Sequence, residues 1–104
     1  MSRYRLSRQA DDDLEAIADW IARQNPAAAD KVLDALLGSI RNLARNHGSG
    51  SLRDDLRPGL RIFPAKRPAQ NYVICYYEIP DGIEVSTVLH SRRDWIGLFE
   101  RGNR

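Results

Sequence analysis

The residues of this sequence best suited to chemistry are cations, a histidine and tyrosines in its second half. A guanidinium or ammonium group stabilises charge on a phosphate, and a histidine or tyrosine transfers a proton. Cleavage of RNA needs a base for the 2′-hydroxyl, an acid for the leaving oxygen and cations at the scissile phosphate. The candidates for this chemistry are His90, Arg61, Lys66, Arg92 and Arg93, with Tyr72, Tyr76 and Tyr77.

His90 is the strongest general acid or base of this set, but the sequence offers it no obvious second partner. We therefore expect His90 to bond a backbone group or a carboxylate, or to lie at an interface, and we expect no catalytic residue. If cleavage did occur, His90, Arg61 and Arg93 would carry it. His47 lies in a Gly/Ser loop with no partner nearby and is expected to be solvated. The alternative fate of the arginines is ion pairing, with Arg53, Arg57, Arg61 and Arg93 facing Asp54, Asp55 and Asp94.

Two further features invite a chemical interpretation that their spacing does not support. Asp11, Asp12 and Asp13 are consecutive, so on a helix their carboxylates point about 100° apart and do not converge on one ion. Near a helix N-terminus each is favoured by the macrodipole, by about 0.3–1 kcal/mol. Cys75 is the single cysteine, without a Cys/His cluster around it, which predicts a small buried side chain on a strand. We expect neither a metal nor a cofactor.

The elements that must position these residues are helical in the first half of the chain. Arg3 to Leu6 alternates like a short strand, and Ser7 stands where an N-cap belongs. A first helix is predicted over about residues 8–24, and Asn25 with Pro26 closes it and opens a second helix of roughly 18 residues. The apolar stripes that indicate the two helices are Ala10, Leu14, Ile17, Ala18 and Ile21, then Ala29, Val32, Leu33, Leu36, Leu37, Ile40, Leu43 and Ala44.

The second half predicts strands. The segment 60–63 is a weak strand ended by Pro64, and 72–79 is the strongest, rich in aromatic and β-branched residues. A turn at 80–82, with Gly82 at positive φ, leads into a strand over 83–89. A short helix over about 93–99 ends the chain, and 46–51 is a turn-rich loop. Strict alternation in the last strand places Ile83, Val85, Thr87 and Leu89 on one face and Glu84, Ser86, Val88 and His90 on the other.

This order predicts an α+β fold: an N-terminal strand and a helical hairpin packed on a mostly antiparallel sheet, in two layers, with a short C-terminal helix. A chain of 104 residues is expected to form a single domain over 1–104. The apolar share of 42% and charged share of 29% suit a globular core rather than a disordered segment.

Charge and hydropathy exclude several classes of protein. Residues 1–45 carry seven Lys/Arg against seven Asp/Glu, and residues 46–104 carry nine against seven, so no dense basic stripe marks a dedicated nucleic-acid binder. The apolar runs are far shorter than the roughly 20 residues that cross a bilayer, and the first residues do not resemble a secretory signal. We expect a cytoplasmic protein with no membrane contact.

Motifs along nearly the whole chain resemble the ParE toxins of the RelE/ParE superfamily. The N-terminal motif is Tyr4-x-Leu6-Ser7 followed by Ala10-x-x-Asp13-Leu14-x-x-Ile17. The later motifs, in the same order as in the family, are Arg53-x-Asp55-Leu56-x-Pro58-Gly59-Leu60-Arg61, Tyr72-Val73-Ile74-x-Tyr76 and Val88-Leu89-His90-x-x-Arg93-Asp94.

The resemblance implies the toxin of a type II toxin–antitoxin pair that inhibits DNA gyrase by binding it. It also implies a cognate ParD-like antitoxin, a ribbon-helix-helix protein whose C-terminal tail wraps the toxin in a hetero-oligomer and through which DNA is bound only indirectly. The predicted antitoxin-binding residues are Trp20, Leu33, Leu37, Arg57 and Arg61, and the predicted target-binding residues are His90, Arg92, Arg93 and Trp95. Trp20 has the alternative of closing the domain core.

Two other functions stay open at this point. The sister branch of RelE-like toxins shares the fold and cleaves mRNA on the ribosome, which is the alternative to gyrase inhibition. A chain of this fold that has lost toxicity and serves as a regulatory partner is the third possibility.

Overall fold

The helical hairpin and the sheet form from the segments that their sequence patterns predict. The computed structural model describes residues 3–93 and 95–100 of the chain. Its elements are β1 (Arg3–Leu6), α1 (Arg8–Gln24), α2 (Pro26–Arg45), β2 (Ser51–Leu52), β3 (Leu60–Pro64), β4 (Tyr72–Ile79), β5 (Gly82–His90) and α3 (Trp95–Glu100). The α+β prediction is therefore confirmed, with three differences in its elements. The short strand β2 was expected to be loop, and α3 begins two residues later than expected. Pro64 was expected to end the strand 60–63, but it belongs to β3 and pairs with Val73 of β4.

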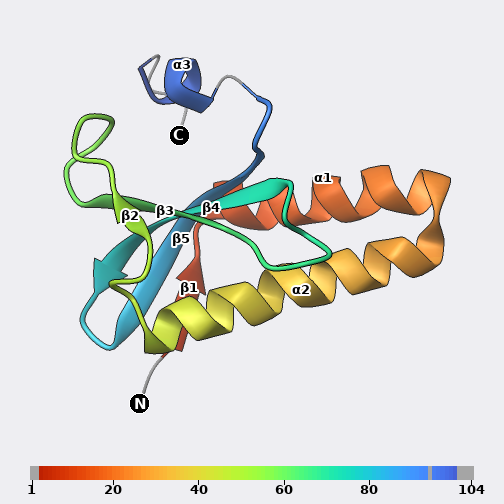
Figure 1. The fold of residues 1–104 in the computed structure, drawn as a ribbon, viewed down its shortest axis with the longest axis horizontal. Helices are drawn as coiled ribbons and strands as arrows, with labels where there is room; N and C mark the ends of the chain where they lie inside the picture. Colours follow the sequence, from red (N-terminus) through yellow and green to blue (C-terminus); the bar gives the residue numbers. More distant parts are fainter. Residues whose placement is uncertain (1–2, 94, 101–104) are drawn as a thin grey trace.

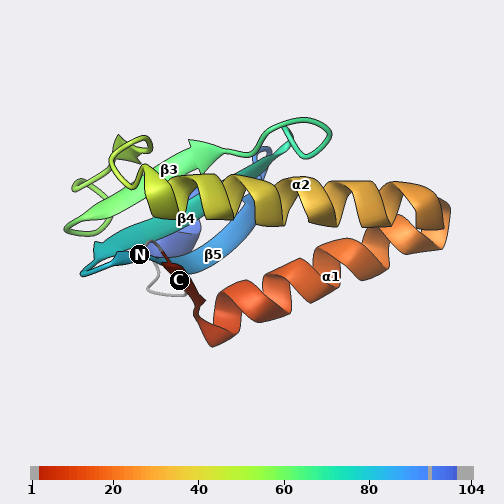
Figure 2. The ribbon, with the colours of Figure 1, turned by 90° about the horizontal axis from the view of Figure 1, so that it is seen from below.

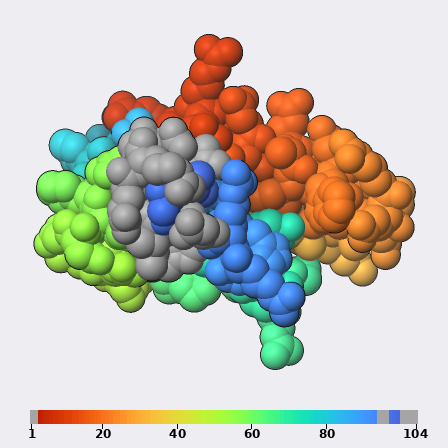
Figure 3. All heavy atoms as spheres, turned by 90° about the horizontal axis from the view of Figure 1, so that it is seen from above, coloured from red at the N-terminus to blue at the C-terminus, as the bar shows by residue number. Residues whose placement is uncertain are grey.

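The sheet has the order β1-β5-β4-β3-β2, in which β1 runs parallel to β5 and the other neighbours are antiparallel. The hairpin of α1 and α2 lies across one face and projects beyond the sheet (Figures 1 and 2). A space-filling view from the side of α3 shows the described residues of this helix, in dark blue, between α1 and the loop before β3 (Figure 3). Because Leu98 and Phe99 of α3 pack there on Leu60 of β3, the fold has a partial third layer in addition to the two expected.

Helix ends follow the predicted capping. The Ser7 hydroxyl accepts a hydrogen bond from the Ala10 amide at 3.0 Å, and the Asn25 side chain accepts from the Ala28 amide at 3.2 Å. Pro26 occupies the first turn of α2, where its missing amide costs nothing. The connection between the helices is one residue, so the two helices lie antiparallel with their apolar stripes toward the sheet.

The turn between β4 and β5 differs from its prediction. Asp81, not Gly82, has the positive φ, at 78°. Aspartate tolerates this conformation better than most residues. Gly82 is required for another reason: a Cβ built on it would lie 1.7 Å from the Arg3 carbonyl oxygen, because β1 pairs directly alongside.

The last strand contains a β-bulge that changes which residues reach the core. Cys75 pairs with Thr87 and Tyr76 with Val85, so Ser86 has no partner in β4. The inserted residue reverses the alternation. Val88 therefore joins Ile83 and Val85 in the cluster beneath the helices, whereas Leu89 packs in the cluster beneath α3. The strict two-face assignment predicted for this strand is wrong beyond Ser86.

Candidate partner-binding surface

A groove opens between the two long helices. Leu14 on α1 faces Leu33 and Leu37 on α2, residues one turn apart on the same side of their helix. The groove has a volume of about 360 Å³. Its lining consists of five apolar and three acidic residues, namely Leu6, Leu14, Ala18, Leu33 and Leu37 with Asp11, Glu15 and Asp19. Its floor suits apolar side chains, and its α1 rim is negatively charged.

The structure brings together two of the five residues predicted to bind an antitoxin. Leu33 and Leu37 both line the groove. Trp20 follows the rim residue Asp19 along α1 and is 57% exposed. The alternative that Trp20 closes the core is therefore wrong; its indole is exposed, but Trp20 does not line the groove.

Arg57 and Arg61 lie elsewhere and are engaged within the chain. The Arg57 guanidinium lies 5.7 Å from the centroid of the Phe99 ring and donates to the Leu56 carbonyl at 3.1 Å. Arg61 donates through Nε to Glu78 Oε1 at 2.9 Å and through a terminal nitrogen to the Gly50 carbonyl at 2.7 Å. Of the predicted carboxylate pairs, the structure shows Arg53 with Asp55, whose pKa is lowered by that hydrogen bond.

Glu78 joins the loop after α2 to the sheet. His47 Nδ1 lies 2.6 Å from Glu78 Oε2, on the opposite side of the carboxylate from Arg61. These hydrogen bonds, first that of His47 and then that of Arg61, lower the pKa of Glu78. The Tyr76 hydroxyl donates to the His47 carbonyl at 2.8 Å and accepts from the Gly50 amide at 2.8 Å. The expectation that His47 has no partner is therefore wrong.

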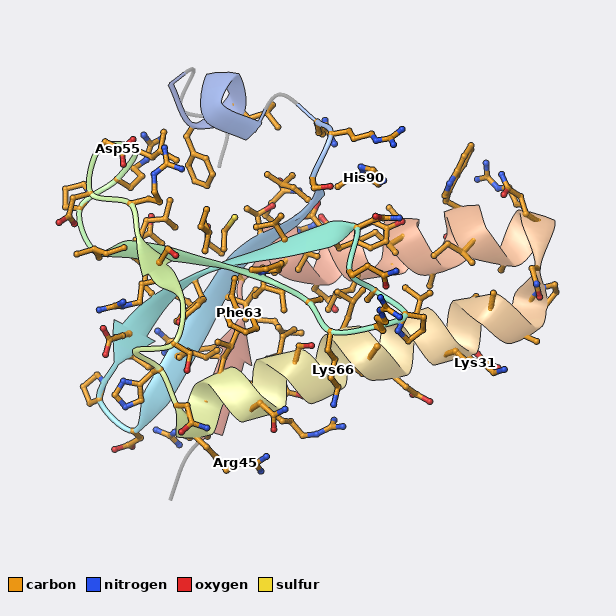
Figure 4. The ribbon with its side chains drawn as sticks, in the orientation of Figure 1. Lys31, Arg45, Asp55, Phe63, Lys66 and His90 are labelled. Atoms are coloured by element: carbon orange, nitrogen blue, oxygen red, sulfur yellow. The ribbon has the colours of Figure 1, made fainter. Side chains whose placement is uncertain are left out.

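His90 is the last residue of β5, and it contacts Tyr72 of β4 and the turn that follows β5. Its ring meets that of Tyr72 edge-on, with centroids 5.4 Å apart and planes at 79° (Figure 4). His90 Nδ1 accepts from the Arg92 amide at 3.1 Å, and the His90 carbonyl accepts from the Arg93 amide at 3.0 Å. The arginine side chains of this turn are exposed. Asp94 and the side chain of Trp95 lie outside the described residues.

The residues named for RNA cleavage fall into separate groups: Tyr72 and the backbone of Arg92 contact His90, but Arg61 does not. Tyr72 pairs with His90 and Tyr76 pairs with Arg61, so four residues along β4 and two strand spacings separate His90 from Arg61. For extended strands this is roughly 16 Å, well beyond hydrogen-bond reach. Tyr76 is fully buried, and burial raises its pKa. Lys66 lies over Gly38 of α2, where a built Cβ would be 3.1 Å from its Nζ.

Asp13 makes structural contacts that the sequence analysis did not predict. Its Oδ2 accepts from the Thr87 hydroxyl and, at 3.0 Å, from the Val88 amide, while its Oδ1 accepts from Gln9 at 2.8 Å. Asp13 thus joins α1 to the C-terminal half of β5, whereas β1 pairs with the N-terminal half. Thr87, a polar residue in an otherwise apolar part of the strand, was the clue in the sequence.

The comparison with protein families decides the class of this chain. A family model described as the ParE toxin of the parDE type II toxin–antitoxin system matches residues 4–95. The chain belongs to the ParE toxin family. It is therefore the toxin of a type II toxin–antitoxin system, and the match includes the groove, the Glu78 cluster and His90.

Two known proteins are similar to this chain. Toxin RelE3 of Caulobacter vibrioides is 26% identical over 91 residues, which cover 88% of this chain and 96% of the relative. A chain of the chromosomal ParDE toxin–antitoxin system from P. aeruginosa superposes with a TM-score of 0.72 at 21% identity, covering 86% of this chain and 96% of that one. This second likeness is one of fold. Among the described residues, no helix of this ParE-family toxin is long and apolar enough to cross a membrane.

Proposed function

We propose that this ParE-family toxin inhibits DNA gyrase by binding it and is neutralised by a ParD-like antitoxin that occupies the groove between α1 and α2. The family resemblance implies the target. The observation that supports this mechanism is that His90 lies roughly 16 Å from Arg61, whose side chain, like that of the buried Tyr76, is engaged in the contacts around Gly50 and Glu78. Because the described residues do not bring His90 and Arg61 together at one reaction centre, we expect the toxin to act through its surfaces.

The groove suits the antitoxin for reasons of shape and charge. Its apolar floor accepts the apolar face of an amphipathic segment, as grooves of this kind do for helical peptides. The acidic rim of Asp11, Glu15 and Asp19 favours a segment that carries basic residues beside its apolar ones. Trp20 is a large exposed aromatic on α1, of a residue type that often anchors interfaces, and an antitoxin that wraps around α1 beyond the groove would reach it. Arg57 and Arg61 are outside this surface and have no part in it.

The turn after β5 is the proposed gyrase contact. The exposed cations Arg92 and Arg93 follow His90 after one residue, and α3 begins at Trp95. This turn follows the C-terminal end of β5, whereas β1 pairs with the N-terminal part of β5. The proposed gyrase contact is therefore separate from the edge strand β1. A toxin that binds through this turn needs its charges there and needs no proton transfer by His90.

A gyrase supercoiling assay with purified toxin tests the proposal. The wild-type chain is expected to block supercoiling or to accumulate cleaved DNA, and addition of the antitoxin is expected to restore activity. Arg92→Glu with Arg93→Glu should weaken inhibition at least tenfold. The matched control, Arg23→Glu with Lys31→Glu, changes two exposed cations at the far end of the hairpin and should retain full inhibition. Equal losses in the two double variants would contradict the proposed contact.

A ribosome-dependent mRNA endonuclease is the second candidate. Two observations favour it: the relative named Toxin RelE3, and the placement of His90 against Tyr72. It predicts cuts at codon positions in translated message and loss of toxicity in His90→Ala. The gyrase proposal predicts DNA-damage signalling without message cleavage, and toxicity that survives His90→Ala.

A further inference from the structure

A second hollow lies where the C-terminal half of α2 passes β1. It has a volume of about 390 Å³ and is lined by Arg3, Tyr4, Arg41, Ala44 and Arg45. Arg41 and Arg45 are one turn apart on α2, and Arg3 and Tyr4 come from the edge strand β1. Three arginines and one tyrosine therefore line one cavity. We call it the arginine pocket.

Positive charge is concentrated around the arginine pocket although the chain as a whole is nearly neutral. No Asp or Glu occurs between residues 35 and 53, whereas α1 carries five acidic residues against two basic ones. Lys66 adds to the same side, since its Nζ and the Arg41 guanidinium both border Gly38. Figure 4 shows Arg45 and Lys66 along this half of α2 and Lys31 toward the far end of the hairpin. The molecule is polarised, with α1 acidic and the arginine pocket basic.

The ion pair that Arg3 of the pocket makes within the chain is weak. Arg3 pairs with Asp81 at 3.4 Å, and the two side chains are 74% and 59% exposed. Exposed pairs of this kind contribute little, so an incoming anion can replace the carboxylate. The free carbonyls at the C-terminus of a helix disfavour anions. In α2 two of these carbonyls are already hydrogen-bonded, because the Asn46 amide donates to the Asn42 and Leu43 carbonyls and the Asn46 side chain donates to the Asn42 carbonyl.

We propose that the arginine pocket binds single-stranded nucleic acid, with phosphates held by Arg41, Arg45 and Arg3 and a base stacked on Tyr4. Arginine forks match phosphate oxygens in pairs, and stacking on an aromatic ring holds bases without regard to sequence. Tyr4 is 36% exposed, which leaves part of its ring open to the solvent. A cavity of about 390 Å³ falls in the range of small-ligand pockets, roughly 300–1,000 Å³.

The aromatic wall favours nucleic acid over an acidic peptide. Carboxylates would use the guanidinium groups equally well, but they have no use for an exposed tyrosine between them. A single-stranded nucleotide would use both, with its phosphate bound by the arginines and its base stacked on the tyrosine. The proposal does not depend on gyrase inhibition, because the pocket is at the opposite end of β5 from the turn assigned to the target.

Fluorescence anisotropy with labelled oligo(dT) and the purified full-length chain tests the proposal. Arg41→Ala with Arg45→Ala is expected to weaken binding at least tenfold. It should also reduce the slope of log affinity against log salt by about 1.4, since each single-strand phosphate contact contributes about 0.7. Tyr4→Leu should weaken binding about tenfold at an unchanged salt slope, because it removes stacking and no charge. Thermal melts of each variant establish that it is folded.

The matched control is Arg23→Ala with Lys31→Ala, which removes the same charge from two exposed positions at the other end of the hairpin. It should leave affinity within about twofold and the salt slope nearly unchanged. Equal losses in both double variants, or no binding by the wild type, would overturn the proposal. So would adenosine monophosphate binding as tightly as the oligonucleotide, which would assign the pocket to free nucleotide. Hexaglutamate binding as tightly, with Tyr4→Leu without effect, would assign it to acidic peptides.

Discussion

Replacement of Asp13 by alanine tests how the helical hairpin is held on the sheet. The Asp13 carboxylate accepts from the Thr87 hydroxyl and the Val88 amide, and both residues are almost completely buried. Alanine removes the acceptor and leaves two buried donors without it. Each unsatisfied buried donor costs about 1–3 kcal/mol, so for the two donors the free energy of unfolding should fall by roughly 2–6 kcal/mol. That is a large part of the 5–15 kcal/mol typical of a domain.

Urea denaturation followed by circular dichroism measures this loss. Asp12→Ala is the matched control, because it removes a neighbouring carboxylate from the same turn that is exposed in the structure. It should change the free energy of unfolding by less than about 0.5 kcal/mol. Asp13→Asn, which keeps an oxygen acceptor, should recover part of the stability. Thr87→Val in the Asp13→Ala background should be less harmful than in the wild type, since the hydroxyl has already lost its acceptor. Similar midpoints for Asp12→Ala and Asp13→Ala would refute the reasoning.

Three further changes have measurable outcomes. Gly50→Ala would place a Cβ 2.6 Å from the Tyr76 hydroxyl, whereas Gly48→Ala meets nothing within 4 Å. The first should lower the unfolding free energy by about 1–3 kcal/mol and the second should not, and equal thermal melts would contradict this. The pKa of Glu78 is lowered in the folded state from its ordinary 4.5, so its stabilisation is present above that pH and lost as the pH falls below it. Glu78→Gln should flatten the fall in stability in that acid range, and an unchanged pH profile would count against the cluster. Leu37→Glu should weaken antitoxin binding at least tenfold in a titration while leaving the melt within a few degrees, and unchanged affinity would exclude the groove.

Local patterns predicted the elements well because short-range chemistry controls them. Ser7 and Asn25 are good caps in any sequence, and Pro26 is tolerated only in the first turn of a helix. The strand 72–79 is recognisable from its own residues, and its bounds agree with the structure. The candidate site was predicted less completely: Leu33 and Leu37 meet in the groove, but Arg57 and Arg61 are used elsewhere.

The sequence by itself determined the family, the helical hairpin and the three longer strands of the second half, because these depend on periodicity, capping and motif order. Tertiary structure alone decided the partners of the polar residues. Asp13 and Thr87 are 74 residues apart, and His47 and Glu78 are 31 apart. The bulge at Ser86, which depends on how β5 pairs with β4, decides that Val88 faces the helices. Contacts between residues so distant along the chain have no local pattern, because each exists only once the fold has brought its two sides together.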